Sequence, residues 1–257
     1  MAAPDDHALA ADLAERAGQL LLALRARGGE PGALRSAGDR QSHEFLMAEL
    51  ARERPADAVL SEEGIDDKAR LTAERVWIVD PLDGTREFGE PGRDDWAVHV
   101  ALWARDAAAG AGDLIAGAVA LPAQDLVLST TTATDQADQV APRPLRLVVS
   151  RSRASRLVKD VAARINAEMV PCGSAGAKVA TVISGENDVY LHSGGFYEWD
   201  TAAPVAVARA RGLYVSRIDG SPVRYNQEDP LLPDILVCRP AIADLLLNAI
   251  RETKHAI

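Results

Sequence analysis

The sequence has only two cysteines, Cys172 and Cys238, which stand far apart and share no Cys-x-x-Cys spacing. A disulfide framework and a zinc site built on paired cysteines are therefore not expected. We expect both to be buried free thiols of a reducing cytoplasm. Cys172 lies beside a glycine-rich turn, and we expect it to be inert rather than redox-active.

Basic residues are also scarce, because 28 Lys and Arg face 38 Asp and Glu and the formal net charge is −10. This balance argues against nonspecific binding to nucleic acid or to a membrane surface, since both need a basic footprint. A small anionic substrate is still compatible with an acidic chain, because bound cations can invert the local field.

Long apolar runs are absent too, and none reaches the roughly 20 residues of a membrane-spanning helix. Residues 1–7 are acidic where a signal peptide would be basic, so we expect a soluble cytoplasmic protein. At 257 residues the chain can bury a large core in one α/β unit or in two adjoining domains.

Two amphipathic helices are expected at the start of the chain. The first begins at Asp5 or Asp6, which are good N-cap residues, and ends at residues 28–29. The second follows a loop at residues 31–32, and on local evidence Asp39 is its N-cap.

The remaining elements suggest two different halves. Strands are expected within residues 57–64 and at 76–79, 96–103, 114–121 and 126–129. The polar, proline-terminated segment 130–144 is the best candidate boundary, which predicts an α+β domain over 1–143 and an α/β domain over 144–257. In the second half, strands at 145–150, 169–172, 188–191, 213–216 and 235–238 alternate with helices at 155–165, 175–183, 201–210 and 241–251.

The most informative stretch is Val-Trp-Ile-Val-Asp-Pro-Leu-Asp-Gly-Thr at residues 76–85. Its apolar start predicts a buried strand that ends at Asp80 and Asp83, and Pro81 and Gly84 turn the chain there. Two carboxylates beside the start of a following helix suit Mg²⁺ and a phosphate group. Taken alone, however, an Asp-x-x-Asp pair is more often an acidic surface turn.

Other polar positions have ordinary structural explanations when each is taken alone. Glu62 and Glu63 end another strand, Asp200 can cap the helix that follows it, and the turn 173–178 lacks the spacing of known nucleotide-binding loops. His99 stands among apolar residues, and we expect a packed histidine rather than a metal ligand. Strand ends do gather ligands in open α/β sheets, which favours a shared site.

Together these segments resemble one enzyme family. Asp39, Ser-Glu-Glu at 61–63, Asp-Pro-Leu-Asp-Gly-Thr at 80–85 and Glu-Trp-Asp at 198–200 resemble the inositol monophosphatase superfamily of Mg²⁺-dependent, lithium-sensitive phosphatases. Segments 77–88, 174–178 and 197–203 are most similar to its CysQ type, and the Thr-Arg-Glu-Phe ending of the first is the main discriminator. The resemblance implies a layered α/β/α/β/α sugar-phosphatase fold.

The resemblance also implies an activity. CysQ-type enzymes of sulfur assimilation remove the 3′-phosphate of 3′-phosphoadenosine 5′-phosphate, and we expect the same for its sulfated form. A broader inositol or fructose bisphosphate phosphatase is the alternative enzyme, and a non-catalytic binder of metal or phosphate ligands is the alternative from another class. Homodimers are common among relatives, although no interface signal is visible in this sequence.

By the same resemblance, particular residues receive roles. Two or three Mg²⁺ ions would be held by carboxylates and one carbonyl: Glu62, Asp80, Leu82, Asp83 and Asp200. Asp80 would bridge two ions and a third would lie near Glu62. Asp39, with Thr85 as relay, would activate water, and the N–H groups of Gly84 and Thr85 would hold the phosphate.

The substrate's adenosine would lie over the second half. The resemblance assigns to it Ser150, Ser174, Ala175, Lys178 and Glu198. For the 5′-phosphate, Arg151, Arg224 and Tyr225 are candidates because phosphate prefers guanidinium forks. No spacing argument decides between this role and that of ordinary surface arginines.

Overall fold

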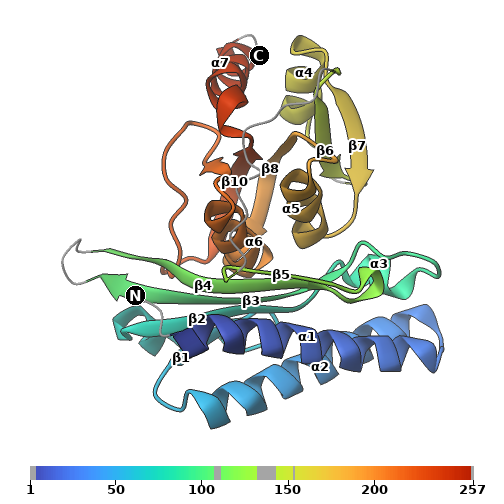
Figure 1. Cartoon of the computed structure of the whole chain (residues 1–257), viewed down its shortest axis with the longest axis vertical. Helices are drawn as coiled ribbons and strands as arrows, with labels where there is room; N and C mark the ends of the chain where they lie inside the picture. Colours follow the sequence, from blue (N-terminus) through green and yellow to red (C-terminus); the bar gives the residue numbers. More distant parts are fainter. Residues whose placement is uncertain (1–3, 107–110, 132–142, 153, 256–257) are drawn as a thin grey trace.

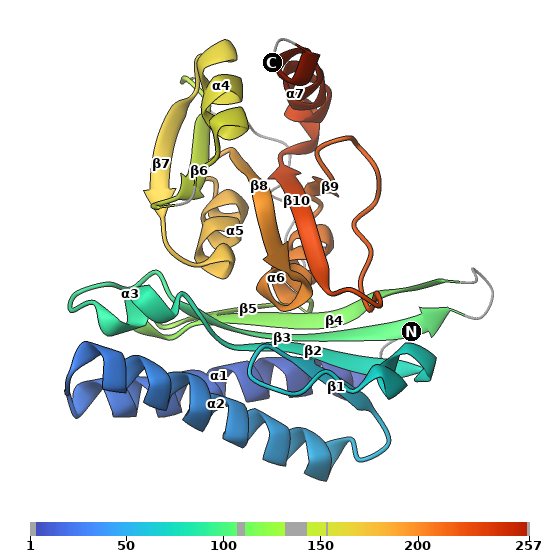
Figure 2. The same cartoon turned by 180° about the vertical axis from the view of Figure 1, so that it is seen from behind.

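The computed structural model describes residues 4–106, 111–131, 143–152 and 154–255, so most of the expected boundary segment lies outside the described residues. Five layers are stacked in the order helix, sheet, helix, sheet, helix (Figures 1 and 2). The expected layered fold is confirmed. None of the helices in these ranges is long and apolar enough to cross a membrane.

The helices are α1 (Pro4–Ala26), α2 (Pro31–Glu53), α3 (Thr85–Gly89), α4 (Arg156–Arg164), α5 (Ala175–Ser184), α6 (Glu198–Ala210) and α7 (Ala243–His255), with short 3₁₀ turns at Lys68–Thr72, Pro122–Gln124 and Pro240–Ile242. The strands are β1 (Ala58–Ser61), β2 (Arg75–Asp83), β3 (Ala97–Asp106), β4 (Ala111–Leu121), β5 (Leu126–Ser129), β6 (Arg146–Ser150), β7 (Glu168–Cys172), β8 (Val189–Tyr197), β9 (Tyr214–Ser216) and β10 (Leu231–Cys238).

The first sheet has the order β1-β2-β3-β4-β5, with β1 and β2 parallel and the other pairs antiparallel. Helices α1 and α2 cover one face, and α5 and α6 cover the other (Figure 1). Its strands alternate their side chains between these two faces, so Trp77 and Val79 pack toward α1 and α2 while Val76 and Ile78 pack toward α6. Both faces are apolar, and β2 is therefore buried along nearly its whole length.

The second sheet has the order β7-β6-β8-β10-β9. Strands β7, β6 and β8 are parallel, whereas β10 runs antiparallel to β8 and β9. Helices α5 and α6 lie between the two sheets, and α4 and α7 cover the outer face (Figure 2). The ends of β2 and β6 and the first turns of α5 and α6 meet where the two halves adjoin. The division into two domains stays a prediction.

Two expected N-caps at the start of the chain are wrong. Helix α2 begins at Pro31, and its cap is Glu30, whose carboxylate accepts the Ala33 N–H at 2.8 Å. Proline suits the first helical position because its missing N–H would be unpaired there. Asp39 therefore lies inside α2. Asp6 lies inside α1, where its buried carboxylate accepts bonds from Arg75 at 2.9 and 3.0 Å.

Helix α6 also begins earlier than the sequence predicts. Strand β8 runs on to Tyr197, and α6 starts at Glu198, so Asp200 is already in the first helical turn. Its carboxylate accepts the Tyr197 N–H at 2.6 Å. The interpretation of Asp200 as the residue before the helix is therefore wrong by one turn, although its carboxylate does bond an otherwise unpaired N–H.

The two thiols behave as the sequence predicts. Both are free, Cys238 is buried and Cys172 is partly buried. Burial raises the pKa of Cys172 to about 11 and that of Cys238 to about 12. Neither thiol is therefore ionised near neutral pH, and Cys172 lacks the thiolate character that redox activity requires.

Candidate active site

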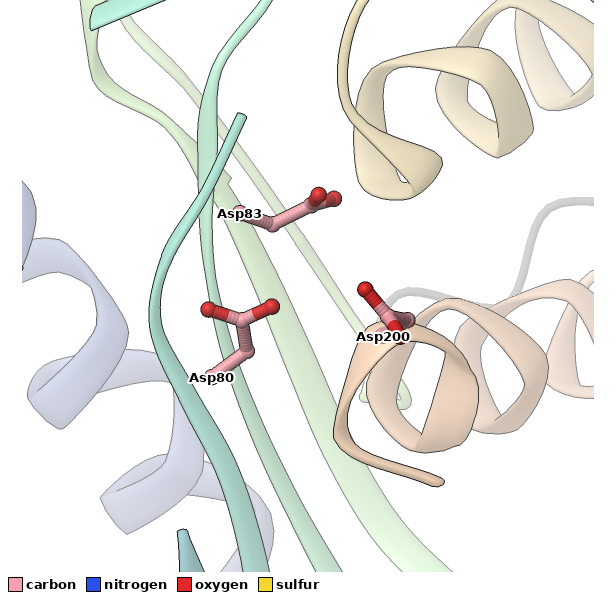
Figure 3. Close-up of side chains that lie close together, drawn as sticks. All are labelled: Asp80, Asp83 and Asp200. Atoms are coloured by element: carbon pink, nitrogen blue, oxygen red, sulfur yellow. The ribbon is translucent and has the colours of Figure 1, made fainter. Parts of the chain in front are cut away.

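Three carboxylates from two distant parts of the chain converge where the halves meet. Asp80 and Asp83 lie at the end of β2, and Asp200 lies in the first turn of α6. Each offers one oxygen such that all three oxygens lie within 4.8 Å of one another. Figure 3 shows the side chains pointing toward a common space. Asp80 is 1% exposed and Asp83 8% exposed, whereas Asp200 is partly buried.

The turn at the end of β2 positions the first two acids. The Leu82 N–H donates to Asp80 Oδ1 at 3.0 Å, and the buried Ser42 hydroxyl donates to the Pro81 carbonyl at 2.7 Å. The pairing with β3 shifts its register between Asp80 and Asp83, so both side chains reach the same side. These contacts hold Asp80 and Asp83, which are three residues apart in the sequence, so that both side chains point in the same direction.

Gly84 then takes the chain from β2 into α3. Its φ is +84°, in the left-handed region that favours glycine. A Cβ at this position would stand 3.1 Å from the Ser174 side chain and 3.3 Å from the Asp95 carbonyl. Only a glycine lets the turn at residues 82–85 approach the start of α5 this closely.

Asp83 is tied directly to the second half. Its Oδ2 accepts the Gly176 N–H from α5 at 2.9 Å and lies 3.2 Å from His99 Nε2. Burial would raise the pKa of Asp83, but His99, Lys178 and the Gly176 N–H together hold it below its ordinary value. Asp83 is therefore ionised. His99 is completely buried, with Nδ1 3.2 Å from the Trp199 carbonyl, so the expected packed histidine is confirmed.

For Asp80 and Glu62, by contrast, the effects that raise the pKa outweigh those that lower it. Burial, and then the charges of Glu62, Asp83 and Asp200, raise the pKa of Asp80 well above its ordinary value. Burial of its carboxyl group also raises the pKa of Glu62 to about 7, even though the hydrogen bond with Asp80 opposes the shift and the residue as a whole is exposed. Acids packed this closely repel one another, and a bound divalent cation would relieve that repulsion. These carboxylate oxygens therefore fit a metal ion.

Asp39 and Thr85 are in contact, as the sequence reasoning requires. Thr85 Oγ1 lies 3.2 Å from Asp39 Oδ1 and 3.0 Å from the Leu82 carbonyl oxygen, and its hydrogen can serve either acceptor. Burial raises the pKa of Asp39 to about 6, Glu63 adds to the shift, and the Thr85 hydrogen bond opposes it. A carboxylate with this pKa is ionised at neutral pH and can still accept a proton.

A cavity of about 380 Å³ opens above the three acids. Most of the residues that the sequence assigns to the site line it: Glu62, Asp80, Leu82, Asp83, Gly84, Thr85, Ser150, Ser174, Ala175, Lys178 and Asp200. Asp39 is not part of the lining and reaches it through Thr85. The fold thus brings residues from β2, α3, β6, α5 and α6 to one cavity.

Glu198 is placed differently from the sequence prediction. It is 0% exposed, does not line the cavity, and accepts the backbone N–H groups of Asn226 at 2.7 Å and Gln227 at 2.8 Å. Because the Glu198 side chain is fully buried outside the cavity, it does not reach a ligand there, and it holds the 226–227 segment instead. This expected substrate contact is wrong.

The candidates for the 5′-phosphate separate in the same way. Tyr225 is buried and donates its hydroxyl to Thr201 Oγ1 at 3.1 Å. Arg224 is exposed and is not part of the cavity lining. Arg151 does line the cavity, so it alone among these three candidates can meet a ligand there.

Sequence reasoning missed an aromatic wall, which consists of Tyr190, His192 and Phe196 on β8. All three line the cavity, and successive ring centroids lie 6.4 and 4.8 Å apart. Lys178 Nζ lies 5.4 Å from the Tyr190 ring centroid. Tyr190 and His192 are two residues apart, the spacing at which side chains of one strand share a face, and this spacing could have indicated the wall. The predicted strand ended at residue 191 and so did not include His192.

Comparisons with known proteins identify relatives of this chain. The sequence matches the inositol monophosphatase family over residues 8–255. A 3′-phosphoadenosine 5′-phosphate phosphatase of Mycobacterium leprae (strain TN) is 50% identical over 254 residues, which cover 96% of this chain and 94% of that protein. The 3′(2′),5′-bisphosphate nucleotidase CysQ of Escherichia coli (strain K12) is 29% identical over 207 residues, or 77% of this chain and 81% of that protein.

A solved structure is similar over nearly the whole chain. CysQ of Bacteroides thetaiotaomicron, a bacterial member of the inositol monophosphatase family, has a TM-score of 0.76 at 28% identity and covers 91% of this chain and 97% of its own. The resemblance to the CysQ type, drawn above from three short segments, is thus confirmed over 91% of the chain. This chain belongs to the inositol monophosphatase family.

Proposed function

We propose that this protein is a Mg²⁺-dependent phosphatase that removes the 3′-phosphate of 3′-phosphoadenosine 5′-phosphate to give AMP and phosphate. Its sulfated form, 3′-phosphoadenosine 5′-phosphosulfate, would give adenosine 5′-phosphosulfate. The observation that carries the proposal is one cavity with three clustered carboxylates on one side and an aromatic wall on the other. The name of the M. leprae relative supports the same substrate.

The donor set favours Mg²⁺ among divalent ions. Hard oxygen ligands and substrate phosphate oxygens are what Mg²⁺ takes up in proteins. Glu62, Asp80, the Leu82 carbonyl, Asp83 and Asp200 would hold two ions, with a third near Glu62. Bound there, Mg²⁺ supplies neutralising charge for the phosphate and lowers the pKa of water.

The chain's own residues then orient the reaction. Asp39 would accept the proton of the attacking water, with Thr85 between it and the cavity, and its pKa of about 6 leaves it ionised at neutral pH. The N–H groups of Gly84 and Thr85 would hold the phosphate oxygens. Since phosphoryl transfer needs little covalent help from protein, this positioning is the main contribution of the side chains.

The nucleoside would bind on the other side of the cavity. In the aromatic wall, the partly exposed ring of His192 would stack on a purine, backed by the buried rings of Tyr190 and Phe196. Ser150, Ser174, Ala175 and Lys178 line the same cavity. Lys178 Nζ donates to the Gly173 carbonyl, which holds the amine at the floor of this space. Stacking contributes roughly 1–3 kcal/mol per base, or about 5- to 150-fold in affinity, and an inositol ring gains none of it.

Phosphate release by the purified protein tests the proposal. We expect kcat/KM for 3′-phosphoadenosine 5′-phosphate to exceed that for inositol 1-phosphate and fructose 1,6-bisphosphate, with Mg²⁺ required and lithium inhibitory. Comparable rates on all three would favour the broader phosphatase and refute the substrate assignment. Binding without turnover, unaffected by Asp39→Ala, would favour a non-catalytic binder. The cytoplasmic location and the homodimer stay predictions.

A further inference from the structure

A second cavity of about 290 Å³, here called the outer pocket, adjoins the active-site cavity at the end of β6. Its lining residues are Val149, Ser150, Arg151, Ser152, Ala154, Lys159, Met169 and Pro171. Ser150, Arg151 and Ser152 line both cavities, so the two spaces meet along these three residues. A ligand with one phosphate at the three acids can extend past Arg151 into the outer pocket.

The outer pocket carries positive charge in an acidic chain. Among the described residues, the charged side chains that line it are those of Arg151 and Lys159. The Lys159 side chain is exposed and takes part in none of the ion pairs found between the described residues. In a chain whose net charge is −10, the charge that Lys159 brings to the outer pocket is therefore suited to an anion.

Arg151 is oriented by two acids of the α3 region. Its Nη1 lies 3.2 Å from Glu87 Oε1 and 3.0 Å from Glu90 Oε2, and Nη2 also bonds Glu90. Glu87 is largely buried, whereas 36% of the Glu90 side chain is exposed and Arg86 shares it. Glu87 therefore fixes the guanidinium, and an incoming anion can replace Glu90 at its outer edge.

We propose that the outer pocket binds the second anionic group of the substrate, a 5′-phosphate or 5′-phosphosulfate, with Arg151 at its entrance and Lys159 farther along. This inference rests on the proposed function. Guanidinium forks bind phosphate oxygens through paired bonds, and Lys159 adds a point charge for a longer anion. Arg151 and Lys159 thereby distinguish bisphosphate nucleotides from 3′-monophosphates.

The test compares kcat/KM for three substrates: adenosine 3′-monophosphate, 3′-phosphoadenosine 5′-phosphate and 3′-phosphoadenosine 5′-phosphosulfate. In Arg151→Ala, the ratio of bisphosphate to monophosphate should fall about 10- to 100-fold, the size typical of a lost charge-assisted contact. Lys159→Ala should lower the rate on the phosphosulfate more than on the bisphosphate. Arg224→Ala, which removes an exposed arginine outside both cavities, should leave every ratio as in the wild type.

The Glu90→Gln variant distinguishes an effect on anion binding from an effect on folding. If Glu90 competes with the substrate anion for Arg151, this variant should raise the bisphosphate ratio, opposite in sign to Arg151→Ala. A purely structural Arg151–Glu90 pair would lower activity on all three substrates in both variants, and that result would overturn the proposal. If Arg151→Ala does not fold, judged by circular dichroism, Glu90→Gln and Lys159→Ala decide the question by the same ratios.

Failure of this inference is distinguishable from failure of the proposed function. Wild-type protein that prefers inositol 1-phosphate to both nucleotides refutes the function. Wild-type protein that prefers the bisphosphate, but whose ratios stay within twofold in Arg151→Ala and Lys159→Ala, keeps the function and refutes the outer pocket as the anion site.

Discussion

Replacing Arg70 with methionine tests how the metal ligands are held in place. Arg70 is 1% exposed and lies in the 3₁₀ turn after the Glu62 segment. Its guanidinium donates to both carboxylate oxygens of Asp66, to Asn226 Oδ1 at 2.7 Å and to the Gln227 carbonyl at 2.8 Å. Since Glu198 at the start of α6 binds the N–H groups of the same 226–227 segment, Arg70 connects the Glu62 side of the site to the helix that carries Asp200.

The cost of Arg70→Met follows from these contacts. Two acceptors, on Asn226 and Gln227, lose their donor, at about 1–3 kcal/mol each. The Asp66 side chain is 25% exposed, so its loss is screened and adds little. Breaking a buried charged network costs about 3–5 kcal/mol in general, in agreement with this sum. At about 2–4 °C per kcal/mol for a chain of this size, the melting temperature should fall by roughly 6–20 °C.

Two measurements check this reasoning. Urea unfolding gives the free energy of unfolding, and Mg²⁺ titration of activity well below the melting temperature gives the half-activating concentration, which should rise. Arg156→Met is the control, because Arg156 pairs with Asp160 at the surface and should cost less than about 1 kcal/mol. An Arg70→Met protein within 1 kcal/mol of wild type would refute the argument from burial. Lower stability with an unchanged Mg²⁺ requirement would refute the connection to Asp200.

The remaining predictions concern the site itself. Asp83→Asn and Asp200→Asn should each lower kcat at least 100-fold at saturating Mg²⁺, and near-normal turnover would exclude the proposed ligands. In chelator, Asp200→Asn should not lower the melting temperature because it removes a mutually repelling charge, whereas Asp83→Asn should lower it because it removes the charged partner of His99. If Asp39 accepts the proton of water as proposed, its ionised form is the active one, and kcat/KM should fall as pH drops through about 6. In Thr85→Val this acid limb should move to higher pH, because the lost hydrogen bond had lowered the pKa of Asp39, and an unmoved limb would contradict the pairing. In Gly176→Ala the new Cβ would stand 2.4 Å from His99 Nε2 and displace the N–H that binds Asp83, so turnover should fall at least tenfold with a lower melting temperature, both measured beside wild type.

Many elements of the fold were predicted from residues that lie close together in the sequence. The apolar run before Asp80 and Asp83, the proline between them and the glycine after them dictate a buried strand that ends in two acids, and β2 has this form. The alternation of strands and helices in the second half likewise follows from periodicity. These features depend on residues within about ten positions of one another, so the sequence displays them directly.

Helix starts were predicted less well, because several residues can each act as a cap. Asp39 and Asp200 are both good N-caps in isolation, yet both lie inside helices whose starts are set by Pro31 and by the extension of β8 to Tyr197. Asp200 contributes an oxygen to the acidic cluster from within its helix, and Asp39 bonds Thr85 at the edge of the cavity from within its own. At both positions, the N-cap interpretation made the proposed role in the site harder to recognise from the sequence.

The sequence by itself determined the metal-binding motif, the layered fold and the kinship that the comparisons bear out, because these reside in short segments and their order. Only the tertiary structure decided that Glu198 binds the 226–227 backbone, that Arg151 rather than Arg224 faces the cavity, and that Tyr190, His192 and Phe196 form its far wall. The physical reason is burial. Whether a polar side chain meets a ligand or a backbone N–H depends on which distant segments pack beside it, and no local pattern records that.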